Sequence, residues 1–234
     1  MQSSYANPYT VAANAEPSAR AAFIRSTYLH LGFSILAFIA VTYFLLQQSW
    51  VPGLVENMLG MGWLLVLGLF MGVSFIADKL ARSETSQGVQ YAGLGLFIVA
   101  QAFVFLPLLY FAAIKANEGS LIFQKAGITT AFIFAGLTAT VFVTRKDFSF
   151  LRGFLMIGGF VALGIIVVSI LFGFSLGTIF SGAMAIFASI GILYSTSNIL
   201  HHYRTDQPVS AALSLFSSVA LLFWYILQIF MSRE

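Results

Sequence analysis

The chain is poor in charged residues and has no thiol groups. It contains no cysteine, so disulfides, thiolate nucleophiles and cysteine-bound metals are excluded. Only 8% of its 234 residues are charged, against about 25% in an ordinary soluble domain. Too few polar side chains remain to cover a water-facing surface of this size. This shortage excludes both a soluble globular enzyme and a disordered chain.

The apolar residues gather in seven blocks. Hydrophobic side chains make up 59% of the chain and include 25 phenylalanines. A helix needs about 20 apolar residues to cross the ~30 Å hydrocarbon core of a bilayer. Suitable blocks occupy residues 27–46, 59–77, 89–113, 127–144, 153–173, 178–200 and 210–231. Because lipid offers no partner to a free backbone group, the fold class is expected to be all-α, a polytopic membrane protein with seven transmembrane helices.

The basic residues predict how the chain crosses the membrane. Residues 1–22 lack the apolar core of a signal peptide and are expected to form a flexible cytoplasmic tail before one transmembrane domain, residues 23–234. With the N-terminus inside, the cytoplasmic side holds most of the eleven Lys and Arg. They are Arg20, Arg25, Lys79, Arg82, Arg145, Lys146, Arg152 and Arg204. The expected location is the inner (plasma) membrane, with the lipid bilayer rather than nucleic acid as partner.

The expected membrane interior is polar but uncharged. No carboxylate, Lys or Arg lies at the centre of a block, and no nucleophile–base, phosphate-binding or metal-binding motif is present, so we expect no enzyme, metal or cofactor site. Hydroxyl and amide groups gather instead near one end of the last two blocks. They are Ser195 and Asn198 in one block and Ser214, Ser217 and Ser218 in the other. One interpretation is a polar vestibule that passes an ion. The other is that each hydroxyl bonds to its own helix and Asn198 bridges helices.

Two further features lie at the expected cytoplasmic ends. His201 and His202 end one block, where a pH-sensing pair and a solvated helix end are both plausible interpretations. In the loop before residues 153–173, Asp147 is expected to cap the next helix. Arg145 and Arg152 are expected to position that loop at the membrane surface.

Four stretches resemble the Bax inhibitor-1-like family. Residues 27–32 are similar to its early Thr-Tyr helix, and residues 144–151 resemble its basic-Asp-x-Ser loop. Residues 192–196, Ile-Leu-Tyr-Ser-Thr, are close to the family's Ile-Leu-Tyr-Asp-Thr. Residues 212–223 are near its Ala-Leu-x-Leu-Tyr-Leu-Asp-Ile-x-Asn-Leu-Phe. The resemblance covers about residues 20 to 231.

The resemblance implies a bundle with its last helix near the centre. It also implies a calcium leak, a modulator of stress signalling, or, in bacteria, an inner-membrane protein linked to cation flux or quality control. Two aspartates form a pH-sensitive latch in the calcium-leak members, and they align with Ser195 and Ser218; the family's Asn aligns with Leu221. The first hypothesis is therefore a channel for Ca²⁺ or another cation without that latch. The alternative is a non-transporting regulator that binds other membrane proteins.

Overall fold

The computed structural model describes residues 10–60, 62–84, 86–117, 119 and 121–233. These residues form one short 3-10 helix and eight α-helices. The elements are η1 (Ala12–Asn14), α1 (Pro17–Leu46), α2 (Val51–Gly60), α3 (Trp63–Ala81), α4 (Gln87–Asn117), α5 (Ile122–Thr144), α6 (Leu151–Phe172), α7 (Gly177–His201) and α8 (Pro208–Met231). Within the described residues, the seven helices other than α2 are long and apolar enough to span a membrane. The predicted all-α polytopic fold is confirmed.

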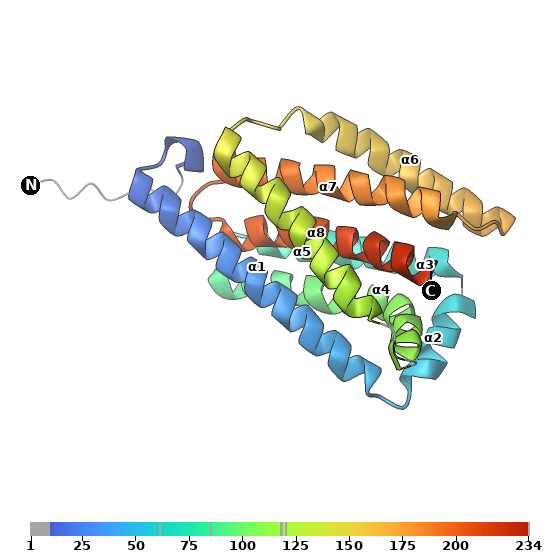
Figure 1. Ribbon diagram of the computed structural model, residues 1–234. Helices are drawn as coiled ribbons and strands as arrows, with labels where there is room; N and C mark the ends of the chain where they lie inside the picture. Colours follow the sequence, from blue (N-terminus) through green and yellow to red (C-terminus); the bar gives the residue numbers. More distant parts are fainter. Residues whose placement is uncertain (1–9, 61, 85, 118, 120, 234) are drawn as a thin grey trace, which may run out of the picture.

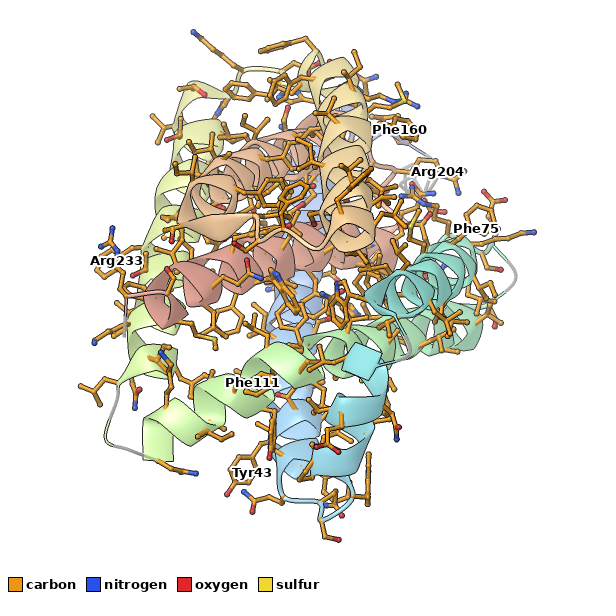
Figure 2. All side chains as sticks on the ribbon, turned by 90° about the vertical axis from the view of Figure 1, so that its right-hand side faces the viewer. Tyr43, Phe75, Phe111, Phe160, Arg204 and Arg233 are labelled. Carbon is orange, nitrogen blue, oxygen red and sulfur yellow. The ribbon has the colours of Figure 1, made fainter. Side chains whose placement is uncertain are left out.

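Helix α8 lies at the centre of the bundle and α6 at its edge (Figure 1). Helices α1, α3, α4, α5 and α7 all pack on α8, whereas α6 packs mainly on α7. Half of the most apolar stretch of α8 is buried, against 11% of that of α6. Figure 2 shows Phe160 on α6 and Phe75 on α3 pointing away from the bundle, and both rings are more than 70% exposed. In a membrane these aromatic rings face lipid.

The loops define two ends of the bundle. Residues 10–16 lie at the same end as the α3–α4, α5–α6 and α7–α8 loops, and we call this the N-terminal end (Figure 1). The opposite, C-terminal end carries α2, the other loops and the end of α8. The basic residues assigned to the cytoplasm by the sequence therefore belong to the N-terminal end, and the orientation itself stays a prediction.

The structure differs from the predicted tail over residues 10–22, while residues 1–9 lie outside the described residues. Helix α1 begins at Pro17, ten residues before the predicted block, because proline suits the first turn of a helix. Ahead of it, the backbone N–H of Ala12 donates to the Tyr203 carbonyl (2.8 Å), and that of Thr205 donates to the Thr10 carbonyl (3.1 Å). These bonds hold the segment against the α7–α8 loop.

The predicted helix over 59–77 is wrong at its start. Leu59 belongs to the short helix α2, and α3 begins only at Trp63. Gly62 separates the two helices with a φ of 87°, a left-handed conformation that interrupts an α-helix. Val51, Val55 and Met58 are buried at spacings of four and three residues, so one face of α2 packs on the bundle.

Candidate functional site

The hydroxyl groups of α7 and α8 meet near the N-terminal end. The Ser195 Oγ lies 3.4 Å from the Oγ atoms of both Ser214 and Ser218. The two helices are neighbours in an antiparallel hairpin, and Gly191 lets them approach closely, since a Cβ there would lie 3.2 Å from the Ser218 Oγ. The structure thus brings together three of the five polar residues singled out in the sequence.

These hydroxyls line a cavity of about 580 Å³ between α3, α6, α7 and α8. We call it the inner chamber. Ser74 and Ser217 also line it, and the Ser74 Oγ is buried without a hydrogen-bond partner among the described residues. Asp78 and Arg82 complete the wall as an ion pair with an N–O distance of 2.8 Å. Most of the lining is apolar, and within it these hydroxyls and the ion pair, which carries no net charge, offer partners to water.

Ser197 and the predicted site residue Asn198, both on α7, make contacts away from these hydroxyls. The Ser197 Oγ accepts a hydrogen bond from the Phe148 backbone N–H (2.8 Å) and lies 3.4 Å from the Asp147 Oδ1. The backbone carbonyl of Asn198 accepts the backbone N–H groups of His202 and Tyr203, which closes the end of α7. Ser197 thus holds the α5–α6 loop, and neither Ser197 nor Asn198 lines the inner chamber.

Asp147 fastens the α5–α6 loop to α7. Helix α6 has Phe150 at its N-cap position without a side-chain cap, so the expected capping role of Asp147 is wrong. The Asp147 Oδ1 accepts the Ser149 backbone N–H (2.8 Å) in a local turn, and its Oδ2 lies 3.0 Å from the His202 Nε2. Asp147 therefore stabilises the α5–α6 loop and does not cap α6.

The arginine and histidine residues near Asp147 differ in their contacts. Arg145 ends α5 in a left-handed conformation, with φ at 52°, and Arg152 lies exposed in the first turn of α6. His201 and His202 make different contacts, although their ring centroids lie 6.3 Å apart. His202 reaches Asp147, whereas the His201 Nε2 is buried without a hydrogen-bond partner among the described residues. A pH-sensing role of the two imidazoles stays a prediction.

We expect the Asp147 contacts to make the free energy of unfolding depend weakly on pH in the acidic range. Hydrogen bonds from the Ser149 backbone, and then from the Ser149 and His202 side chains, hold the pKa of Asp147 below its usual value. Its contribution is complete above the unfolded-state pKa and is lost as pH falls through the lowered pKa. Both ion-pair partners are almost half exposed, so this loss is at most about 1 kcal/mol.

Thermal unfolding in detergent between about pH 3 and about pH 7 checks this effect. Asp147→Asn should remove the acid-dependent loss, while Lys146→Gln, next to it in the same loop, should keep it. Equal acid slopes for the natural chain and Asp147→Asn would contradict the role of the carboxylate.

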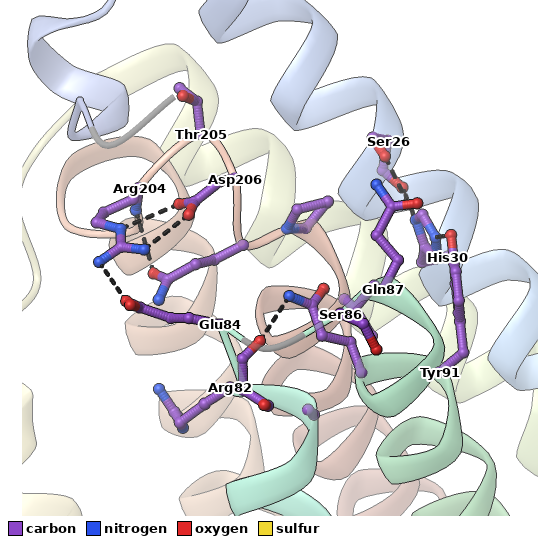
Figure 3. Close-up of a pocket in the computed structure, with 16 residues that line it drawn as sticks. Ser26, His30, Arg82, Glu84, Ser86, Gln87, Tyr91, Arg204, Thr205 and Asp206 are labelled. Atoms are coloured by element: carbon purple, nitrogen blue, oxygen red, sulfur yellow. Dashed lines mark hydrogen bonds and ion pairs between the residues drawn. The ribbon is translucent and has the colours of Figure 1, made fainter. Parts of the chain in front are cut away.

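The sequence did not reveal a second polar pocket, of about 430 Å³, at the N-terminal end (Figure 3). Arg204 of the α7–α8 loop forms ion pairs with Asp206 (2.7 Å) and with Glu84 of the α3–α4 loop (2.8 Å). Hydrogen bonds to Asp206 and then Glu84 raise the pKa of Arg204, which stays cationic. On the other wall, the His30 Nε2 lies 3.0 Å from the Tyr91 hydroxyl. Arg204 and Glu84 lie 120 residues apart, so no local sequence pattern could pair them.

A third cavity, of about 760 Å³, lies toward the C-terminal end. We call it the outer chamber. Trp63, Phe70 and Trp224 give it an apolar wall, and Gln101 lines it although that residue is only 7% exposed. Near its mouth the Ser181 Oγ donates to the Gln228 Oε1 (3.0 Å). Among the described residues, no cluster of three or more His, Asp or Glu side chains is arranged to hold a metal ion.

Known proteins match this chain over nearly its whole length. The family model described as "Inhibitor of apoptosis-promoting Bax1" matches residues 20–234. An uncharacterized Pseudomonas aeruginosa protein is 35% identical over 88% of this chain and 87% of its own. Escherichia coli YccA, called a modulator of the FtsH protease in one strain and an inner membrane protein in another, is 32% identical over 90% and 91%. LIFEGUARD 4 of Arabidopsis thaliana is 29% identical over 93% and 87%.

Proposed function

Because the chain belongs to the Bax inhibitor-1-like family of multi-pass membrane proteins, we propose that it is a non-enzymatic regulator of another membrane protein. The observation that carries this proposal is the 32% identity to YccA over 90% of this chain and 91% of the relative. The family model in addition matches residues 20–234, which contain α2 to α8 and all of α1 except its first three residues. The partner is then a membrane-bound protease of the FtsH kind, in keeping with the relative's name.

The polar interior supports a regulator over a pH-gated leak. At the position of the latch stand Ser195 and Ser218, whose hydroxyls are neutral at every physiological pH. Calcium ions prefer six to eight oxygen ligands, with carboxylates among them, and a serine pair offers only neutral oxygens. The serine pair therefore gives no support to a pH-gated calcium leak, and the regulator is the function that the similarity to YccA favours.

Co-reconstitution tests this function. The tagged protein and an FtsH-type protease would be placed in the same liposomes with a membrane-anchored substrate, and the rate of substrate degradation would be followed. We expect the protein to change that rate and to form cross-links with the protease in native membranes. Another seven-helix protein at equal density serves as the control. An unchanged rate together with an absence of cross-links would count decisively against the proposal.

A second candidate function is cation passage, and the hydroxyl-lined inner chamber is the observation that favours it. The chamber has a volume of about 580 Å³, and the hydroxyls of Ser195, Ser214 and Ser218 line it. Liposomes loaded with a calcium-sensitive dye test this candidate. Flux above that of empty liposomes supports it, and no added flux between about pH 5 and about pH 8 contradicts it.

A further inference from the structure

One face of α8 is polar along almost its whole length. The residues on this face recur every three or four positions, so they stack above one another on one side of the helix. They are Ser214, Ser218, Leu221, Tyr225, Gln228 and, at the C-cap, Ser232. All six line the inner or the outer chamber. Leu221 is the one aliphatic residue in this series.

Leu221 also lies where the two chambers meet. Among the described residues, Leu221 on α8 and Gly159 on α6 are the only two that line both cavities. Gly159 leaves this junction open on its own side, because the nearest atom to an added Cβ would be the Phe187 Cζ at 3.9 Å. The side chain of Leu221 thus lies between the polar groups of one chamber and those of the other.

Both chambers contain polar groups that water could satisfy. In the inner chamber the Ser74 Oγ is buried without a hydrogen-bond partner among the described residues. In the outer chamber Gln101, which is only 7% exposed, contributes to the lining together with Ser181 and Gln228. A buried amide or hydroxyl without a partner is costly unless water or a solute satisfies it. Polar groups that can bind water therefore lie on both sides of Leu221.

We propose that the two chambers are halves of one path for water and small uncharged polar solutes, and that Leu221 closes it as a hydrophobic gate. An apolar constriction between wet spaces blocks passage by excluding water from its narrowest part. The neutral hydroxyl and amide lining sets the class of solute, and the ion pair of Asp78 and Arg82 adds no net charge at the inner mouth. The gate is independent of the partner role and differs from the cation leak in what it passes.

Glycerol permeability of proteoliposomes, followed by light scattering after osmotic shock, tests the gate. Leu221→Asn keeps the side-chain size but makes it polar, and it should raise the permeability about tenfold, as a barrier lower by about 1.4 kcal/mol does. Adding Gly159→Leu should narrow the junction again and return the permeability toward that of the natural chain. Leu163→Asn, which lines only the outer chamber, is the matched control and should change little.

Cysteine accessibility gives a second measurement, because the natural chain has no cysteine. S218C should react with a membrane-impermeant thiol reagent only from the N-terminal end, and Q228C only from the C-terminal end. With Leu221→Asn added, S218C should react from both sides. The proposal is overturned if Leu221→Asn changes neither the glycerol permeability nor the labelling, or if it admits calcium but not glycerol. Calcium flux through the natural chain is measured separately, so a failed leak leaves the gate test intact.

Discussion

Gly93→Ala is expected to destabilise the protein by about 3 kcal/mol, the upper part of the range for overpacking. Gly93 lies where α4 crosses α3, and it is buried. A Cβ at this position would come within 2.5 Å of the Ala81 backbone N and 2.6 Å of the Ala77 carbonyl O. Backbone atoms cannot rotate away as a flexible side chain can, so α3 must move off α4. Small residues permit this close approach of transmembrane helices.

Gly95→Ala is the matched control for that substitution. Gly95 lies two residues further along α4, is exposed, and would have no atom within 4 Å of an added Cβ. Alanine favours a helix over glycine by about 1 kcal/mol, so Gly95→Ala should stabilise slightly while Gly93→Ala destabilises. Thermal unfolding in detergent measures both changes. If the two variants unfold at the same temperature, the packing of α3 on α4 is not as tight as described.

Hydropathy was sufficient to locate the membrane spans, because lipid imposes one length and one backbone solution on each of them. Hydropathy did not locate the helical residues that are polar or the helix that is too short to span a membrane. The first ten residues of α1 are polar enough to resemble a tail, yet Pro17 starts a helix there. Helix α2 is too short for a span, and Gly62 divides it from α3 in a stretch that hydropathy treats as continuous.

The candidate site was partly accessible from the sequence. Two hydroxyl clusters flank a short loop, and an antiparallel hairpin places them at one depth, which predicted the meeting of Ser195 with Ser218. Ser197 follows Ser195 by two residues but lies on another face of α7, where it contacts the α5–α6 loop. Partners far apart in the chain, such as Glu84 with Arg204, and the junction at Leu221 depend on how non-adjacent helices pack, which no local pattern encodes.

Ser195→Asp combined with Ser218→Asp is expected to make stability depend strongly on pH. The two Oγ atoms are 3.4 Å apart, so carboxyl groups in their place would be close neighbours within a chamber of limited size. Two carboxylates this close repel each other, and the folded protein retains a proton that the unfolded chain releases. Stability then falls as pH rises, because the folded state binds more protons than the unfolded state.

The expected loss between about pH 5 and about pH 8 is on the order of 2 kcal/mol, measured by thermal unfolding in detergent. Ser195→Asn with Ser218→Asn is the control, since amides of the same size do not titrate and should follow the pH profile of the natural chain. Each single aspartate variant should show a smaller slope, because one carboxyl beside a serine has no like charge to avoid. If the double aspartate and double asparagine variants respond alike to pH, the side chains at 195 and 218 do not share one depth, and the inner chamber is not built around them.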